Sequence, residues 1–460
     1  MPGCSWRPPG SAPFSASSPA ALVSAAMARR FDQLDRRIVA LALPALGALV
    51  VEPLYNLTDS AIVGHLGRLP LGGLAVATTG LNVLSWVAAF VEMATVSVVA
   101  FRRSSGDDEG AGRAVGAAYL SSLLVGLLAT GLVEAAAPYI ATALGGRAAG
   151  GVHLAAVQYL RIAALGLPAL FLALAGNGHL TGLEDTRRPL LIALVSNLVN
   201  VAAEVGLVYG AHLGIAGSAW GTVIAQLVGA GAFIAASRSA PLRPRRPRRR
   251  DIARLAADGA PLTVRTVALG SALITTTAIA ARLGTAPLGG HQIAMQLWNM
   301  LALVLDALAV PAQVYVSQAL GGGDLERARE VGRRTLRMGA ALGVVLGLVT
   351  MALAPFLPAV FSPDGAVQHQ AMVALLVCGL QQPLAAGAFV LDGLVLGCSQ
   401  YRAMQRAMLL ALVAFAPLAV ATAAYHPLGL LGVWFALFCW LGARTLLLGR
   451  RWRAVTAGAG

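Results

Sequence analysis

The chain repeats itself, and this duplication limits the folds it can adopt more than any other feature. The segment LGRLPLGGLAVATTGLNVL (66–84) returns without a gap 217 residues later as LGTAPLGGHQIAMQLWNML (283–301). In a second block, Gly178, Gly182, Arg187, Gly214 and Gly217 match Gly393, Gly397, Arg402, Gly429 and Gly432. The sequence therefore predicts two lobes built on one plan.

Composition places both lobes in a membrane. The chain has 460 residues, of which 57% are hydrophobic and 12% charged, and its long apolar runs alternate with arginine-rich loops. In a soluble protein the net charge of +14 would indicate nucleic acid. Here the arginines lie in loops, where they set topology and meet anionic lipid headgroups, so we expect membrane lipids and no nucleic acid as partners. The four cysteines include no CxxC pair, which argues against a disulfide framework or a cysteine metal site.

About twelve apolar runs approach the ~20 residues that cross a bilayer as a helix. They cover 38–65, 71–100, 114–138, 152–176, 189–210, 214–237, 253–282, 288–318, 335–358, 368–397, 405–424 and 428–449. We expect an all-α integral membrane fold, because lipid satisfies no backbone hydrogen bonds and the short alternating segments of a β-barrel are absent from the sequence. A duplicated membrane chain is the usual build of a secondary transporter, with the substrate path between the halves.

The predicted organisation has five parts. They are a disordered tail (1–27), an N-lobe with six spans (28–237), a basic cytoplasmic linker (238–251), a C-lobe with six spans (252–453) and a short tail (454–460). The segment AALVSAAM (20–27) is a short candidate for a signal-peptide core, but we favour Met27 as the true start of the chain.

Arginines predict the orientation. They precede the first span, follow the last, and occupy every second loop, including the run RPRRPRRR (243–250). Both termini are therefore expected in the cytoplasm, in the cell membrane. Six spans return each half to the same side, so the repeat is parallel and its axis runs along the membrane normal.

Several charged residues fall inside the predicted spans, where a carboxylate costs roughly 2.5–3.5 kcal/mol. They are Glu52, Asp59, Glu92, Glu134, Arg161, Glu204, Arg265, Asp306 and Asp392. Glu134 is expected to be solvated at the outer end of its span, Glu52 can pair with an arginine, and Arg265 can snorkel. Glu92 either pairs with Arg161 or faces a central cavity. Asp59, Glu204, Asp306 and Asp392 are the functional candidates.

Spacing groups four oxygen-bearing side chains in the N-lobe. Asn200 precedes Glu204 by four residues, so both lie on one helix face, and Thr222 on the next span adds a hydroxyl. Together with Asp59 they can hold Na⁺, or equally a proton, because two neighbouring carboxylates in a low dielectric repel each other. Pro44 lies in the same span as Asp59 and invites a kink, which predicts a moving element.

Energetics and the absence of motifs favour ion-driven transport over enzymatic chemistry. One charge crossing ~100 mV yields about 2.3 kcal/mol, or roughly a fifty-fold concentration ratio. The sequence contains no GxxxxGK[ST], HExxH or GxSxG motif. We therefore expect a protein that is not an enzyme, needs no organic cofactor and uses H⁺ or Na⁺ as its coupling ion.

Four segments resemble the MATE (multidrug and toxic compound extrusion) exporters, particularly their DinF-like branch. They are ALPALGALVVEPLYNLTDSAIVGHLG (42–67), NVAAEVGLVYGAHLGIAGSAWGTVIAQ (200–226), ARLGTAPLGGHQIAMQLWNMLALVLDALA (281–309) and LDGLVLGCSQYRAMQRAM (391–408). The resemblance covers residues 30–453. It implies a V-shaped, two-lobed antiporter of twelve helices. Such a protein, expected to be a monomer, would export small cationic or amphipathic compounds by alternating access in exchange for H⁺ or Na⁺.

The resemblance also assigns residues. It places the N-lobe cation site on Asp59, Asn200, Glu204 and Thr222, the kinking proline on Pro44, the acidic positions of the second half on Asp306 and Asp392, and the helix-seven arginine on Arg265. Glu204 stands where the branch usually has aspartate, and Glu92 has no clear counterpart. The loop FRRSSGDDE (101–109) lacks the usual glutamine-rich ending of the second span.

Two other functions are less favoured by the sequence. A lipid or lipid-linked precursor flippase of the wider superfamily would be expected to carry an arginine-lined cavity and extra helices. A receptor or membrane enzyme would leave the duplication unexplained.

Five large apolar side chains lie in the predicted spans. They either line a hydrophobic cavity or belong to the core, and we favour the core: Trp86, Met93, Met295, Trp298 and Met300.

The two halves of the repeat differ at their intramembrane carboxylate residues. Asp59, Asn200 and Glu204 align with Thr276, Phe415 and Ala419, while Asp306 and Asp392 align with Ala89 and Asn177. The glycine and proline framework is shared and the acidic groups are not. This difference predicts the coupling site in the N-lobe.

Overall fold

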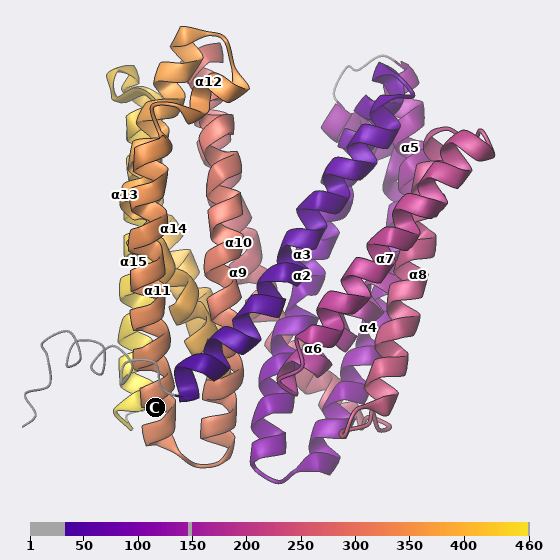
Figure 1. The fold of residues 1–460 in the computed structure, drawn as a ribbon, viewed down its shortest axis with the longest axis vertical. Coiled ribbons are helices and arrows are strands. Elements are labelled where there is room, and N and C mark those ends of the chain that lie inside the picture. The colour runs from indigo at the N-terminus through magenta and orange to yellow at the C-terminus, as the bar shows by residue number, and fades with distance from the viewer. Residues whose placement is uncertain (1–32, 146–149, 459–460) are drawn as a thin grey trace, which may run out of the picture.

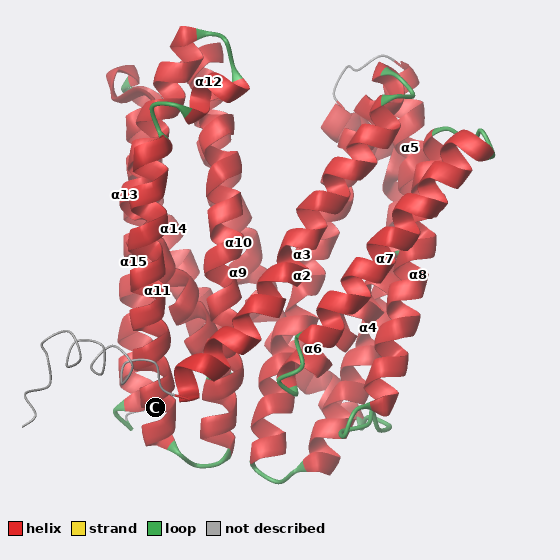
Figure 2. Cartoon of the chain, viewed as in Figure 1, coloured by secondary structure: helices red, strands yellow, loops and turns green. Residues whose placement is uncertain are grey.

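The computed structural model describes residues 33–145 and 150–458, and every regular element in these ranges is a helix (Figure 2). The predicted tail 1–27, the candidate signal-peptide core and the proposed start at Met27 lie outside the described residues.

Each lobe consists of one half of the sequence. The N-lobe comprises α2 (Gln33–Gly64), α3 (Arg68–Ser104), α4 (Asp108–Gly145), α5 (Gly150–Ala164), α6 (Leu167–Gly182), α7 (Arg187–Val205), which the π-turn Gly206–Gly210 extends, and α8 (Ile215–Ser239). The C-lobe comprises α9 (Arg249–Leu283), α10 (Thr285–Gly321), α11 (Leu325–Leu353), the short α12 (Leu357–Phe361), α13 (Gly365–Gly397), α14 (Tyr401–Ala424) and α15 (Gly429–Thr456). Within the described ranges, eleven helices are long and apolar enough to span a membrane, or twelve when α5 and α6 count as one span.

The predicted span 152–176 is a broken helix. Its halves, α5 and α6, meet at an angle of 52°. Pro168 at the start of α6 lacks a backbone N–H and cannot continue the hydrogen-bond ladder of α5. At the break, the Cβ of any larger residue in place of Gly166 would collide with the side-chain amide of Gln226 on α8. The sequence pattern located this span but not its bend.

Several helices extend beyond the apolar segments from which they were predicted. The run 428–449, for example, becomes a helix that continues through Arg450, Arg451 and Arg453 to Thr456. Arginine is a good helix former, so leaving the apolar environment does not end the backbone ladder. Span prediction therefore found the membrane segment rather than the whole helix.

The two lobes form a V (Figure 1), as predicted. At its closed end lie the α3–α4 and α10–α11 turns, and there α3 contacts α10. Gln313 Nε2 donates to the Met93 carbonyl at 2.7 Å and to Ser97 Oγ at 2.8 Å, and Ser97 Oγ donates to the Leu396 carbonyl at 2.9 Å. These buried hydrogen bonds join the lobes at the narrow end, and the helices diverge toward the other end.

Polar contacts extend this joint to the surface. Glu184, in the turn between α6 and α7, accepts hydrogen bonds from Arg37 at 3.2 Å and from Gln318 Nε2 of the C-lobe at 2.9 Å. The first turn of α2 reaches across to the C-lobe, where Asp35 pairs with Arg334 at 3.3 Å. The closed end is thus held by one buried cluster and a polar rim.

Candidate functional site

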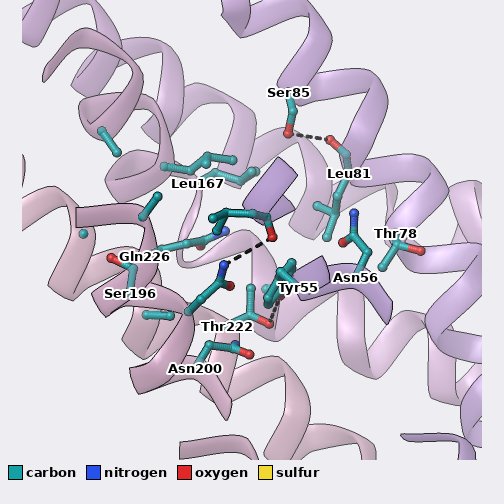
Figure 3. A pocket seen from close by; sticks show the side chains of 18 of the residues that line it. Tyr55, Asn56, Thr78, Leu81, Ser85, Leu167, Ser196, Asn200, Thr222 and Gln226 are labelled. Atoms are coloured by element: carbon teal, nitrogen blue, oxygen red, sulfur yellow. Dashed lines mark hydrogen bonds between the residues drawn. The ribbon is translucent and has the colours of Figure 1, made fainter. Parts of the chain in front are cut away.

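A cavity of about 310 Å³ lies inside the N-lobe between α2, α3, α5, α6, α7 and α8 (Figure 3). Its polar wall is rich in amides, contributed by Asn56, Asn82, Asn197, Asn200 and Gln226. Serine, threonine and tyrosine hydroxyls, apolar side chains and Gly229 complete the lining, and none of the described lining residues carries a charge. The cavity therefore offers hydrogen bonds and apolar surface to a guest, as small-molecule sites commonly do.

The structure brings the four predicted N-lobe residues together. Asp59 on α2, Asn200 and Glu204 on α7, and Thr222 on α8 are all at most 9% exposed. Asp59 Oδ1 accepts a hydrogen bond of 2.6 Å from Ser218 Oγ, and the Asp59 and Glu204 carboxylates interact electrostatically. Gly221 permits this convergence, because a Cβ there would lie 3.1 Å from the Glu204 backbone.

The carboxylate site and the cavity lie next to each other along the same helices and form two layers of one site. Tyr55, Asn200 and Thr222 line the cavity, while Asp59, Glu204 and Ser218 each lie four residues away on α2, α7 and α8. Four residues are about one helical turn, so the carboxylates lie one turn beyond the cavity wall. Side chains at this spacing share a helix face, which explains why both layers point into the lobe.

A hydroxyl bridge forms the boundary between the layers. Thr222 Oγ1 shares hydrogen bonds with the hydroxyl of Tyr55 at 2.9 Å and that of Tyr159 at 3.3 Å (Figure 3 shows the former). Sequence reasoning missed Tyr55, Tyr159 and Ser218. The four-residue spacings Tyr55–Asp59 and Ser218–Thr222 were visible signals, whereas Tyr159 enters from α5 and has no such signal.

The C-lobe holds a different arrangement. Asp392 on α13 forms ion pairs with Arg265 on α9 and Arg444 on α15, and all three are at most 8% exposed. The half-buried Asp306 of α10 lies close enough to interact with this cluster electrostatically. Arg265 therefore does not snorkel, because its guanidinium is held by a buried carboxylate. The predicted substrate role of Asp306, Asp392 and Arg265 stays a prediction.

Arg444 was missed by sequence reasoning although it lies inside the predicted span 428–449. It precedes Arg450, Arg451 and Arg453, so it resembled the start of the positively charged helix end. Its burial against Asp392, with Phe389 and Trp440 rings 5.4 and 5.7 Å from the guanidinium carbon, reveals an interior residue.

Three further intramembrane charges have partners within the N-lobe. Arg161 pairs with Glu134 at 3.8 Å. Glu92 Oε1 accepts a hydrogen bond of 2.8 Å from Asn177. The side chains of Glu52 and Trp86 lie outside the described residues. Met295 and Trp298 belong to the C-lobe core, as favoured from the sequence, whereas Met300 is exposed.

The duplicated fold and the paired cavity and carboxylate layers define the class as a two-lobed membrane transporter. The chain belongs to the MatE family of multidrug and toxic compound extrusion transporters, whose model matches residues 44–205 and 261–423. The two matched ranges fall on the two lobes, in agreement with the internal repeat.

Relatives and solved structures agree with this assignment. The chain is 30% identical to Protein DETOXIFICATION 44, chloroplastic, of Arabidopsis thaliana over 92% of this chain and 83% of that protein. It is 27% identical to DNA damage-inducible protein F of Escherichia coli, with 91% and 92% covered. A MOP superfamily transporter from Pyrococcus furiosus shares the fold with a TM-score of 0.85 at 19% identity, over 93% of this chain and 97% of that one.

Proposed function

We propose that this protein is a secondary active antiporter that exports cationic or amphipathic small organic compounds in exchange for H⁺ or Na⁺. The observation that carries the proposal is the layered N-lobe site, in which two buried carboxylates, Asp59 and Glu204, lie one helical turn beyond an uncharged, amide-rich cavity. An organic guest fits the cavity, and a small cation fits the carboxylates.

The layers supply a physical reason for exchange. Two buried carboxylates are costly when both are charged and unpaired, so the site favours occupation by a proton or Na⁺. The Asn200 amide and both Glu204 oxygens are buried and make no hydrogen bond among the described residues, which fits a ligand-binding role. An organic cation in the cavity and a small cation at the carboxylates are both attracted by the negative charge of Asp59 and Glu204. Because the two cations also repel each other, binding of one weakens binding of the other.

The V-shaped arrangement of the lobes supports the proposal of alternating access. The lobes meet at the end that carries the arginine-rich loops, which the topology rule places in the cytoplasm of a cell-membrane protein. With this orientation, we infer that the V corresponds to a conformation closed to the cytoplasm. Both layers of the site come from one chain, which supports a monomer as the working unit.

The flippase alternative is less favoured by the cavity. A pocket for phosphate-bearing lipid precursors calls for cationic walls, and the described residues that line this cavity are neutral. Lipid scrambling in liposomes that proceeds without any cation gradient would reverse this preference.

The coupling ion can be identified in inverted membrane vesicles. We expect ethidium transport to follow an imposed ΔpH or an imposed Na⁺ gradient and to collapse when that gradient is dissipated, because occupation of the carboxylate layer drives the exchange. Vesicles with Asp59→Asn serve as the control. Transport that persists without either gradient would contradict antiport.

Parting of the closed end can be tested by cross-linking. We expect a Ser97→Cys/Gln313→Cys variant cross-linked by a short bis-methanethiosulfonate reagent, which forms a reducible disulfide with each cysteine, to lose export, because these contacting side chains lie on opposite lobes. Reductant should restore export, and each single variant treated in the same way should remain active. Full export by the cross-linked protein would show that the lobes need not separate at this end.

A further inference from the structure

The repeat relates the N-lobe cavity to the C-lobe ion cluster. The offsets of 217 and 215 residues that align the two halves place Arg265, Asp392 and Arg444 opposite Ala48, Asn177 and Gly229. Ala48 and Gly229 line the N-lobe cavity. Two buried arginine side chains therefore occupy a region of the C-lobe. At the same helical positions, the N-lobe carries an alanine and a glycine, which leave this region open.

Neighbouring positions show the same contrast. The C-lobe counterparts of cavity-lining Asn200, Gln226 and Ala193 are Phe415, Leu441 and Met408. All three counterparts are at most 2% exposed and belong to the C-lobe core. The C-lobe therefore fills with side chains the region that the N-lobe keeps open, on the same helical framework.

Gly229 is a tight part of the cavity wall. A Cβ at this position of α8 would lie 2.9 Å from Ser196 Oγ of α7, which lines the cavity as well. A longer side chain would have to displace Ser196 or extend into the cavity, because close-packed helices leave no other space. Ala48, on α2, is the second position where the C-lobe carries an arginine.

We propose that Ala48 and Gly229 set the upper size of the compounds that the N-lobe cavity admits. This inference rests on the proposed function, in which the cavity binds the exported compound. In the C-lobe, the arginines at the same positions hold Asp392 and join α9, α13 and α15. The duplicated framework therefore contains a ligand cavity in the N-lobe and a cluster of buried ion pairs in the C-lobe.

The test compares two cationic dyes of different size, ethidium and the bulkier rhodamine 6G, on purified full-length protein. Fluorescence polarisation gives the Kd of each dye for the wild type, Gly229→Leu and Ala48→Leu. We expect both variants to lose affinity for rhodamine 6G roughly tenfold or more and to bind ethidium with a smaller loss, since one methylene in a fitted pocket changes discrimination by about 10–200-fold.

Gly231→Leu is the matched control. It makes the same chemical change two residues along α8, where a Cβ meets no atom within 4 Å and the residue is exposed. We expect this variant to bind both dyes as the wild type does. Thermal unfolding identifies any variant that fails to fold, and Gly229→Ala and Ala48→Val then provide smaller steps of the same series.

The outcomes separate the two proposals. A wild type that binds neither dye would overturn the proposed function, and the size limit with it. A wild type that binds both dyes, together with folded Gly229 and Ala48 variants whose ratio of Kd values is unchanged, would overturn the size limit alone. The same ratio change in Gly231→Leu would also overturn it.

Discussion

Cells that carry Asp59→Asn should lose resistance to ethidium and quaternary ammonium compounds, down to the level of cells without the protein. Asparagine has nearly the same shape as aspartate, and its Oδ1 can still accept the 2.6 Å hydrogen bond from Ser218. The change therefore removes the negative charge and spares the packing. Without that charge Glu204 is the only carboxylate among the described residues of the layer, and we expect it alone not to sustain the exchange of a proton or Na⁺, so the driving force for export is lost. Growth inhibition and dye efflux measure the effect.

Glu134→Gln is the matched control for this experiment. Glu134 also lies in a membrane-spanning helix, but its side chain is 38% exposed and pairs with an exposed arginine. Exposed ion pairs contribute little, so we expect nearly normal resistance. Undiminished resistance in a well-expressed Asp59→Asn variant would remove Asp59 from the coupling site.

Asp392→Asn should strongly destabilise the folded protein. It leaves the Arg265 and Arg444 guanidinium groups buried without their carboxylate, and breaking such a buried pair costs about 3–5 kcal/mol. Thermal unfolding of the purified protein measures the loss. Asp185→Asn, which disturbs the partly exposed Asp185–Arg188 pair at 3.2 Å, should cost less than about 1 kcal/mol.

A compensated variant separates a structural from a transport role for this cluster. The triple change Arg265→Met, Asp392→Leu and Arg444→Met replaces the charges by apolar side chains and should recover most of the lost stability, as hydrophobic replacement of buried ion networks often does. Recovered stability with normal export would show that the cluster acts as scaffold. An Asp392→Asn protein as stable as the wild type would contradict the expected cost of an unpaired buried guanidinium.

The helices were predictable because each one depends on local sequence. A run of about twenty apolar residues crosses the bilayer as a helix whatever its neighbours are, since only a helix satisfies its own backbone in lipid. The 52° break between α5 and α6 was not predicted, although Gly166 and Pro168 mark the place. A proline kink takes its direction from the packing of its neighbours, which at this break include Gln226 of α8.

The candidate site was predictable in part for a similar reason. The four-residue spacing of Asn200 and Glu204 places both on one helix face. Asp59 and Thr222 join them as oxygen-bearing side chains of other predicted spans, and the resemblance to MATE transporters assigns the same four residues to one cation site. Nothing in the local sequence connects Tyr159 to Thr222 or Arg444 to Asp392, because these contacts join different helices.

The duplication, the membrane helices and the acidic residues on which the two lobes differ can be read from the amino-acid sequence, because they depend on composition and short-range spacing. How each lobe uses the shared helical framework became clear from the packed helices. The same helical positions enclose a neutral cavity in the N-lobe and a buried ion cluster in the C-lobe. Side-chain volume explains this, because Ala48 and Gly229 leave a space between packed helices that Arg265 and Arg444 fill in the other lobe, and such a space forms only when the helices pack together.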